Sequence, residues 1–250
     1  MRLSELLQYR YDRRRPNRYG LRPYLIRDGK KHPFAVICPG GAYHMVCSYV
    51  EGMPFARALN VRGYHAFVVY YRTDEKARYP HPQEDLQRAI KEILSRADEW
   101  RLETEGWSLW GSSAGGHLAA SFCAEEWGTP KPTALVLVYP VITMGEHTHR
   151  ESRENLLGKD ADPEMIERMS VEKRISAGYP ATFLWNGDAD TLVDPINSRM
   201  MEAALGRAGV PHLAEEYEGI EHGAGLAKGT CAEPWFDHAV SFWEEQRSKP

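Results

Sequence analysis

Short apolar runs alternate along the chain with segments whose apolar residues recur at helical spacing. Several of the short runs are apolar at nearly every position, which is typical of strands buried on both faces of a parallel sheet. The predicted strands are Phe34–Cys38, His65–Tyr71, Trp107–Trp110, Ala134–Tyr139, Ala181–Trp185 and His212–Tyr217. This alternation predicts βαβ units, and therefore an α/β fold with a mostly parallel central sheet and helices on both faces.

The clearest predicted helix begins at Pro82, which suits a first helical position, and carries Glu84 and Asp85 near the positive end of its dipole. Its apolar face at helical spacing consists of Leu86, Ala89, Ile90, Ile93, Leu94 and Ala97. Further helices are predicted at about 52–62, 114–126, 195–208 and 234–247.

The stretch from Val141 to Tyr179 interrupts the alternation. It is polar, and it includes a short predicted helix capped by Asp162 with Pro163 at the first position. We expect residues 141–179 to form a small cap over the carboxyl edge of the sheet, within a single domain that spans 1–250.

The composition, with 42% hydrophobic and 26% charged residues and a net charge of −4, is typical of a soluble globular protein. It favours neither nucleic acid nor a membrane as a partner, and no segment approaches the roughly 20 apolar residues of a membrane span. With no export signal recognised, a cytoplasmic location is expected. Cys38 and Cys123 lie in apolar stretches and are predicted to be buried thiols.

Arginines crowd together from Arg10 to Arg18, at positions 10, 13, 14, 15 and 18. A solvated basic face or an ordering arm is the favoured interpretation, and contact with an anionic ligand is the alternative.

The segment Gly111-Ser112-Ser113-Ala114-Gly115 follows a predicted strand and precedes an apolar helix. This G-x-S-x-G pattern in a strand–turn–helix context predicts a nucleophile elbow, with Ser113 as the nucleophile on a strained backbone. Glycines two residues to either side allow the strand and the helix to approach closely. Ser112 is the nearest rival, at the variable position of the motif, and a glycine-rich turn that only packs is the structural alternative.

A second glycine-rich loop, Pro39-Gly40-Gly41-Ala42-Tyr43, follows the strand Phe34–Cys38. A loop at this place can supply backbone N–H groups to a developing oxyanion. Gly41 and Ala42 are the predicted donors from this loop, and Ala114 supplies the N–H after the nucleophile. A phosphate-binding loop is disfavoured because no Lys-Ser/Thr follows the glycines.

Three acids follow the strand Ala181–Trp185. Asp194 precedes Pro195 and a helix, so capping explains it, and Asp188 follows Gly187 and suits a turn. Asp190 has no such structural role and is the predicted acid, with Asp188 in reserve.

His222 lies on a glycine-flanked loop after the last predicted strand and is the predicted base. His117 is expected to pack or to bind a loop. His147 and His149 are expected to be solvated, and no metal site is predicted.

These residues resemble bacterial α/β-hydrolase esterases related to acetyl esterases and acetyl-xylan esterases. The resemblance is carried by the elbow Gly-Ser-Ser-Ala-Gly-Gly-His, the Pro-Gly-Gly-Ala-Tyr loop, the segments 85–90 and 152–158 and the region around His222. It runs from about Pro23 to the end and implies the α/β-hydrolase fold, with Asp190 as the acid through its spacing to Val193. Ala42 departs from the third glycine usual in relatives, which should narrow the oxyanion hole slightly.

The expected reaction is hydrolysis of esters of small acyl groups, above all acetyl, and acetylated sugars are among the expected substrates. It is expected to pass through an acyl-enzyme and to need no cofactor. Tyr43, Trp185 and Trp235 are expected at the mouth of the site, with core packing as the alternative for Trp185. A peptidase or an arylformamidase on the same residues is the first alternative function. A non-catalytic binding module on the same fold is the second, and a homo-oligomer is left open.

Overall fold

The computed structural model describes residues 19–249 of the chain, so the arginines at positions 10–18 lie outside the described part. The described residues form a seven-stranded sheet in the order β1-β3-β2-β4-β5-β6-β7. Its strands are β1 (Gly20–Tyr24), β2 (Phe34–Cys38), β3 (His65–Tyr70), β4 (Ser108–Ser112), β5 (Ala134–Val138), β6 (Ala181–Gly187) and β7 (His212–Tyr217). The six predicted strands are confirmed, with ends shifted by at most two residues.

Every neighbouring pair of strands from β3 to β7 is parallel, whereas β1 pairs antiparallel with β3 at one edge. The strands β2, β3, β4 and β5 are buried at every position, which agrees with their mainly apolar sequences. Because the strands β2 to β7 run the same way, the loops that follow them meet at one edge of the sheet.

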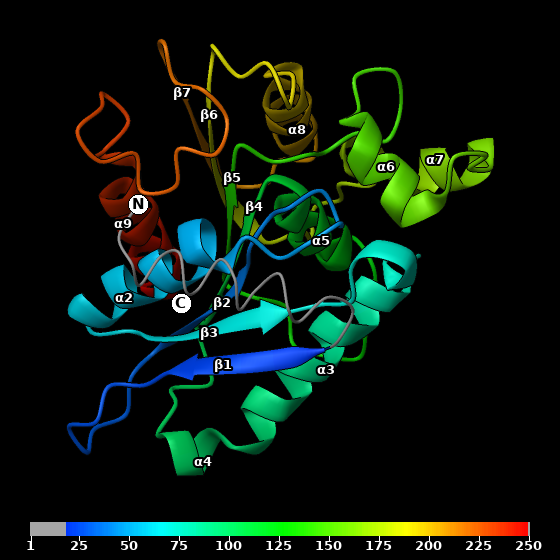
Figure 1. Ribbon diagram of the computed structural model, residues 1–250. Coiled ribbons are helices and arrows are strands. Elements are labelled where there is room, and N and C mark those ends of the chain that lie inside the picture. The colour runs from blue at the N-terminus through cyan, green and yellow to red at the C-terminus, as the bar shows by residue number, and fades with distance from the viewer. Residues whose placement is uncertain (1–18, 250) are drawn as a thin grey trace.

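Helices cover both faces of the sheet (Figure 1). The helices are α2 (Met53–Val61), α3 (His81–Ser95), α4 (Ala97–Trp100), α5 (Ser113–Cys123), α6 (Arg150–Leu157), α7 (Pro163–Met169), α8 (Ile196–Arg207) and α9 (Trp235–Arg247). Shorter turns are the π-helical η1 (Ser48–Gly52) and the 3₁₀ turns η2 (Asp74–Lys76) and η3 (Val171–Lys173). Helices α2 and α9 lie on one face, and α3, α5 and α8 lie on the other (Figure 1).

Aromatic packing fastens α2 and α9 to each other and to the sheet. The Phe55 ring of α2 contacts the rings of Trp235 and Phe236 in α9, at centroid distances of 5.4 and 5.9 Å. Trp185 of β6 in turn lies 5.2 Å from Trp235. Burial of such large rings is a main source of core stability, and here it anchors the C-terminal helix.

The segment between β5 and β6 contains α6, α7 and η3. Asp162 accepts a hydrogen bond from the backbone N–H of Glu164 at 3.0 Å, so the predicted cap of α7 is confirmed. Helix α6 contacts the loop after β2, because the Asn155 side-chain amide donates to the backbone carbonyl of Ala42 at 2.9 Å. In the described part of the chain, no helix is long and apolar enough to cross a membrane.

Candidate active site

Ser113 is the first residue of α5 and directly follows β4. Its backbone is left-handed, with φ of 52°, as expected for a strained elbow. A side chain at Gly111 would meet the backbone oxygen of Gly115 at 2.3 Å, and one at Gly115 would meet the backbone oxygen of Cys38 at 2.1 Å. The two glycines are therefore needed for the close approach of β4, α5 and β2.

The Oγ atom of Ser113 lies 2.9 Å from Nε2 of His222, in the loop that follows β7. The imidazole ring is largely shielded from water, and it packs edge-on against the ring of Tyr139 with a centroid distance of 4.8 Å. A hydroxyl and an imidazole nitrogen at this distance can exchange a proton.

Asp190 occupies the other side of the imidazole. Its Oδ2 atom lies 2.6 Å from Nδ1 of His222, and its Oδ1 atom accepts hydrogen bonds from the backbone N–H groups of Leu192 and Val193, both at 2.9 Å. The carboxylate is almost wholly buried, with 1% of its side chain exposed. An acceptor fixed in this way favours the tautomer with a proton on Nδ1, which leaves Nε2 free to accept the serine proton.

The rival residues have the structural roles that their sequence positions predict. Asp188 accepts a hydrogen bond from the backbone N–H of Gly219 at 2.6 Å, and Asp194 accepts one from Ile196 at the start of α8 at 2.9 Å. Ser112 is buried, and its hydroxyl has no hydrogen-bond partner among the described residues.

The loop after β2 presents its backbone next to Ser113. Gly41 and Ala42 both have positive φ, of 122° and 55°. The backbone N–H of Gly40 donates a hydrogen bond to the Glu51 carboxylate. In contrast, no described residue accepts a hydrogen bond from the N–H of Gly41, Ala42 or Ala114. Ala114 lies in the first turn of α5, where backbone N–H groups are unpaired and the helix dipole favours negative charge.

A cavity of about 280 Å³ opens above the serine. It is lined by Gly41, Ala42, Cys47, Tyr49, Val50, Glu51, Ser113, His149, Glu151, Leu192, His222 and Gly223. The loop after β2 supplies one wall, and two polar residues of the segment between β5 and β6, His149 and Glu151, supply part of another. Val50 and Leu192 add apolar surface. The cavity therefore combines a small apolar volume with polar groups at the side.

The three aromatic residues expected at the mouth do not line this cavity, so that prediction is wrong. Tyr43, Trp185 and Trp235 are fully buried. The Tyr43 hydroxyl pairs with Nδ1 of His117 at 2.8 Å, and the Trp235 indole N–H donates to the carbonyl of Gly225 at 3.1 Å. Tyr43 and Trp235 therefore find polar partners in the core, whereas the buried indole N–H of Trp185 has no hydrogen-bond partner among the described residues.

The remaining predicted histidines divide between core and surface. His117 is buried, as expected, and its Nε2 lies 2.8 Å from the carbonyl of Met169. Burial lowers the pKa of His117 to about 4. His147 is exposed and lies 3.7 Å from Asp194, but His149 is half-buried, binds Ser152 through Nδ1 and lines the cavity. His149 is therefore less exposed than His147.

Glu51 is a buried carboxylate of the site that the sequence analysis missed. It lies in η1, is buried, and lines the cavity together with Ser113. One signal was available, because Glu51 carries the only carboxylate between Pro39 and Ala56, in an otherwise apolar and glycine-rich stretch. A lone acid in such a stretch indicates a specific partner.

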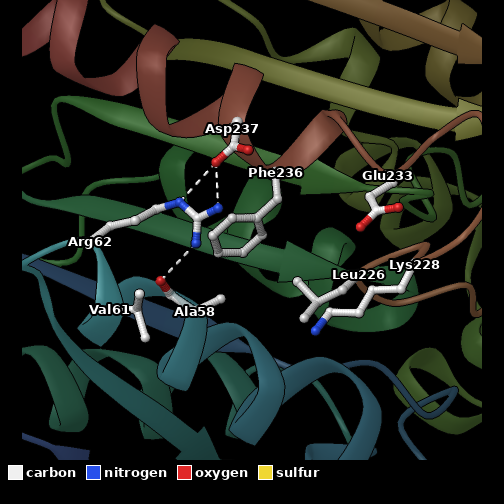
Figure 2. Close-up of a pocket in the computed structure, with 8 residues that line it drawn as sticks. All are labelled: Ala58, Val61, Arg62, Leu226, Lys228, Glu233, Phe236 and Asp237. Atoms are coloured by element: carbon white, nitrogen blue, oxygen red, sulfur yellow. Dashed lines mark hydrogen bonds and ion pairs between the residues drawn. The ribbon is translucent and has the colours of Figure 1, made fainter.

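A second hollow, of about 360 Å³, lies between α2, α9 and the loop that contains Leu226 (Figure 2). There the Arg62 guanidinium binds the Asp237 carboxylate and the carbonyl of Ala58, and it lies over the ring of Phe236. None of the described residues that line this hollow is a serine, cysteine or histidine.

Comparison with known proteins supports the same fold. The family model described as BD-FAE matches residues 24–127. The chain is 30% identical to endo-1,4-beta-xylanase B of Butyrivibrio fibrisolvens, over 92% of this chain and 39% of that protein. It is also 30% identical to acetylxylan esterase of Xylanibacter ruminicola, over 80% of this chain and 41% of that protein. The chain thus spans about two fifths of the length of these curated relatives.

Among solved structures, the acetyl ester-xyloside bifunctional hydrolase from Caldicellulosiruptor lactoaceticus is similar, with a TM-score of 0.83 and 30% identity. The match covers 94% of this chain and 90% of that one, so the likeness extends over both proteins. By sequence and by fold, the chain belongs to the α/β-hydrolase superfamily.

Proposed function

We propose that this protein is a serine carboxylic ester hydrolase that removes small acyl groups, acetyl above all, from esters of sugars. The observation that carries the proposal is the hydrogen-bonded series from Asp190 through His222 to Ser113. Nucleophile, base and orienting acid in this order match the requirements of acyl transfer.

In the proposed acylation step, Nε2 of His222 takes the proton of Ser113 while Oγ attacks the ester carbonyl carbon. The carbonyl oxygen becomes an oxyanion, which the N–H groups of Gly41, Ala42 and Ala114 bind. The Nδ1–H of His222 stays with Asp190, whose charge stabilises the imidazolium. The imidazolium then gives its proton to the leaving alcohol, and the acyl group stays on Ser113.

Deacylation follows the same path with water in place of the alcohol. His222 takes a proton from water, the resulting hydroxide attacks the acyl carbon, and the same N–H groups bind the second oxyanion. The proton then returns through His222 to the Ser113 oxygen, and the carboxylic acid leaves. These steps use only water and groups of the chain itself.

Two observations support a small acyl group on a sugar. The cavity has a volume of about 280 Å³, and Val50 and Leu192 give it apolar surface. A short acyl chain fits a space of this size better than a long one. His149 and Glu151 can hydrogen-bond the hydroxyls of a leaving sugar. The names of the similar acetylxylan esterase and acetyl ester-xyloside hydrolase agree with this substrate class.

A fluorophosphonate probe tests the mechanism. The native protein should be labelled on Ser113, and Ser113→Ala should abolish both labelling and ester hydrolysis while leaving the thermal unfolding transition in place. Labelling that survives in Ser113→Ala, or a native protein that does not react, would contradict the proposal and favour a non-catalytic binding module.

Substrate class is tested by comparing p-nitrophenyl esters of increasing acyl length, aminoacyl anilides and acetylated xylo-oligosaccharides, the last by mass spectrometry. Acetyl esters should react fastest, and loss of acetyl mass from the oligosaccharides should require Ser113. Faster release from the anilides would favour a peptidase, and faster hydrolysis of an aryl formamide would favour an arylformamidase.

The division of the chain into one domain with a cap at about 141–179 is part of this proposal, supported by the contact of Asn155 in α6 with the loop after β2. Two further points stay predictions: the cytoplasmic location, and the absence of nucleic-acid and membrane partners. Formation of a homo-oligomer is left open. Cell fractionation tests the location, and light scattering tests the oligomeric state.

A further inference from the structure

Glu51 is a carboxylate in the interior of the site, yet the proposed mechanism gives it no part. It is 4% exposed and belongs to the π-helical turn η1 that follows the loop after β2. Burying a carboxylate is unfavourable unless its oxygens find donors. Both oxygens of Glu51 have donors, and both donors belong to parts of the catalytic apparatus.

The first donor is the loop that carries the proposed oxyanion hole. The backbone N–H of Gly40 donates to Oε2 of Glu51 at 2.6 Å. The contact lies close to the nucleophile, since a Cβ atom at Gly40 would be 2.7 Å from Ser113 Cβ and 2.9 Å from Glu51 Oε2. With the N–H of Gly40 held in this direction, the next two N–H groups, of Gly41 and Ala42, are left for the substrate.

The second donor leads to the loop that carries His222. The Tyr139 hydroxyl, just after β5, donates to Oε1 of Glu51 at 3.0 Å and accepts a hydrogen bond from the backbone N–H of Gly225 at 3.0 Å. The ring of the same tyrosine packs edge-on against the imidazole of His222. Tyr139 therefore connects Glu51 both to the histidine and to the chain three residues beyond it.

We propose that Glu51 is a positioning residue of this esterase: its carboxylate sets the oxyanion loop through Gly40 and the histidine loop through Tyr139, so that both face Ser113 together. This inference rests on the proposed function. It assigns to one side chain the relative placement of two loops that belong to different ends of the sequence.

The arrangement requires a carboxylate rather than any side chain of the same shape. Glu51 accepts from two donors, and the hydroxyl of Tyr139 already uses an acceptor site for Gly225. An amide at position 51 would turn an NH₂ group toward one of these donors, so one of the two bonds would be lost. Burial raises the pKa of Glu51, while the hydrogen bonds from Gly40 and Tyr139 oppose that shift.

The test compares Glu51→Gln with the native protein in steady-state hydrolysis of p-nitrophenyl acetate and in the rate of fluorophosphonate labelling. For a shift of the reacting groups, we expect kcat and the labelling rate to fall about 10- to 100-fold, with KM changed less than about threefold. Tyr139→Phe, which keeps the ring against His222 but breaks the relay, should lower kcat in the same direction by a smaller factor.

Glu172→Gln is the matched control, because Glu172 is also a buried glutamate but is not among the residues that line the cavity above Ser113. It should leave kcat within about twofold of the native value. A Glu51→Gln variant with native kcat, or with a raised KM and unchanged kcat, would overturn the inference.

Amide hydrogen exchange separates this inference from the proposed function, because it needs no activity. Residues 39–47 and 223–228 should exchange faster in Glu51→Gln than in the native protein and no faster in Glu172→Gln. Failure of the native protein to react with the fluorophosphonate probe would contradict the proposed function alone. Equal exchange of these two segments in Glu51→Gln and in the native protein would contradict the positioning role.

Discussion

The backbone carbonyl of Ile220 lies against Gly187, so close that a Cβ atom at position 187 would be 2.0 Å from the oxygen. Gly187 ends β6, and Ile220 is two residues before His222. The loop after β7 therefore crosses directly over the end of β6, and it then meets Tyr139 at the end of β5. This path carries His222 to Ser113, which lies 109 positions earlier in the sequence.

Gly187→Ala should therefore displace the histidine loop. We expect kcat for p-nitrophenyl acetate to fall by about 100-fold, the loss typical of a catalytic group moved by about 1 Å. Gly206→Ala in α8 is the control, since a Cβ atom there meets nothing closer than 3.8 Å, and it should keep native activity. Equal activity of the two variants would show that the loop does not depend on the contact.

Asp190→Asn should retain the fold but favour the wrong imidazole tautomer, and kcat should fall about 10⁴-fold. Asp188→Asn, two residues earlier, removes a carboxylate whose hydrogen bond in the described part of the chain is accepted from the backbone N–H of Gly219. The kcat of this variant should stay within about threefold of native. Kinetics of the two purified variants check the assignment, which a larger loss in Asp188→Asn would reverse.

Tyr43→Phe tests the place of Tyr43 in the core. The change leaves Nδ1 of the buried His117 without its donor, so the free energy of unfolding should fall by about 1–3 kcal/mol. KM for acetyl esters should not change, because the side chain does not reach the cavity. Urea unfolding and steady-state kinetics measure the two quantities. A raised KM together with an unchanged free energy of unfolding would indicate that Tyr43 contacts the substrate.

Ala42 has a left-handed backbone, with φ of 55°, which is unfavourable for any residue with a Cβ atom. Ala42→Gly should therefore raise the free energy of unfolding by about 1 kcal/mol. Ala203→Gly, at an exposed position inside α8, should lower it by about 0.5–1 kcal/mol. Thermal melting of both variants checks the contrast, and a loss of stability in Ala42→Gly would argue against strain in this loop.

Acid should destabilise the protein partly through His117. Its pKa of about 4 in the folded state lies below the usual value of 6.5, so the unfolded chain binds the proton first as the pH falls. The stabilising contribution is complete above about pH 6.5 and is lost between about pH 6.5 and 4.

In His117→Gln, the drop in unfolding free energy between pH 6.5 and pH 4.5 should be smaller than in the native protein by about 2 kcal/mol. Urea titrations at the two pH values measure the drop directly. If the free energy of unfolding falls equally in His117→Gln and in the native protein, other groups cause the acid sensitivity. His65 is one of them, because burial lowers its pKa to about 4 as well.

The strands could be predicted from the sequence, as could the hydrogen-bonded grouping of Ser113, Asp190 and His222, because both leave local signals. The buried parallel strands are mainly apolar, and the glycines at 111 and 115 flank Ser113 for a steric reason that the structure bears out. Strand β1 escaped prediction because Gly20-Leu-Arg-Pro-Tyr is short, mixed in polarity and contains a proline, as an edge strand can.

Side-chain direction was the part that the sequence could not supply. Tyr43 ends the glycine-rich loop after β2 and Trp185 lies near the end of β6, so both are near the site in sequence, yet both turn into the core. Glu51 was missed for the opposite reason, because its partners Gly40 and Tyr139 are brought to it only by the folded sheet.

The contact between Asn155 and the carbonyl of Ala42 has a consequence for the redesign of selectivity. His149 and Glu151, six and four positions earlier, line the cavity on the side proposed for the leaving alcohol. Under the proposed function, one short stretch of chain would contact the leaving alcohol and also hydrogen-bond the backbone next to the oxyanion. A library that randomises 149 and 151 while retaining asparagine at 155 can change the preferred alcohol without weakening the acyl chemistry, whereas wholesale exchange of the stretch alters both at once.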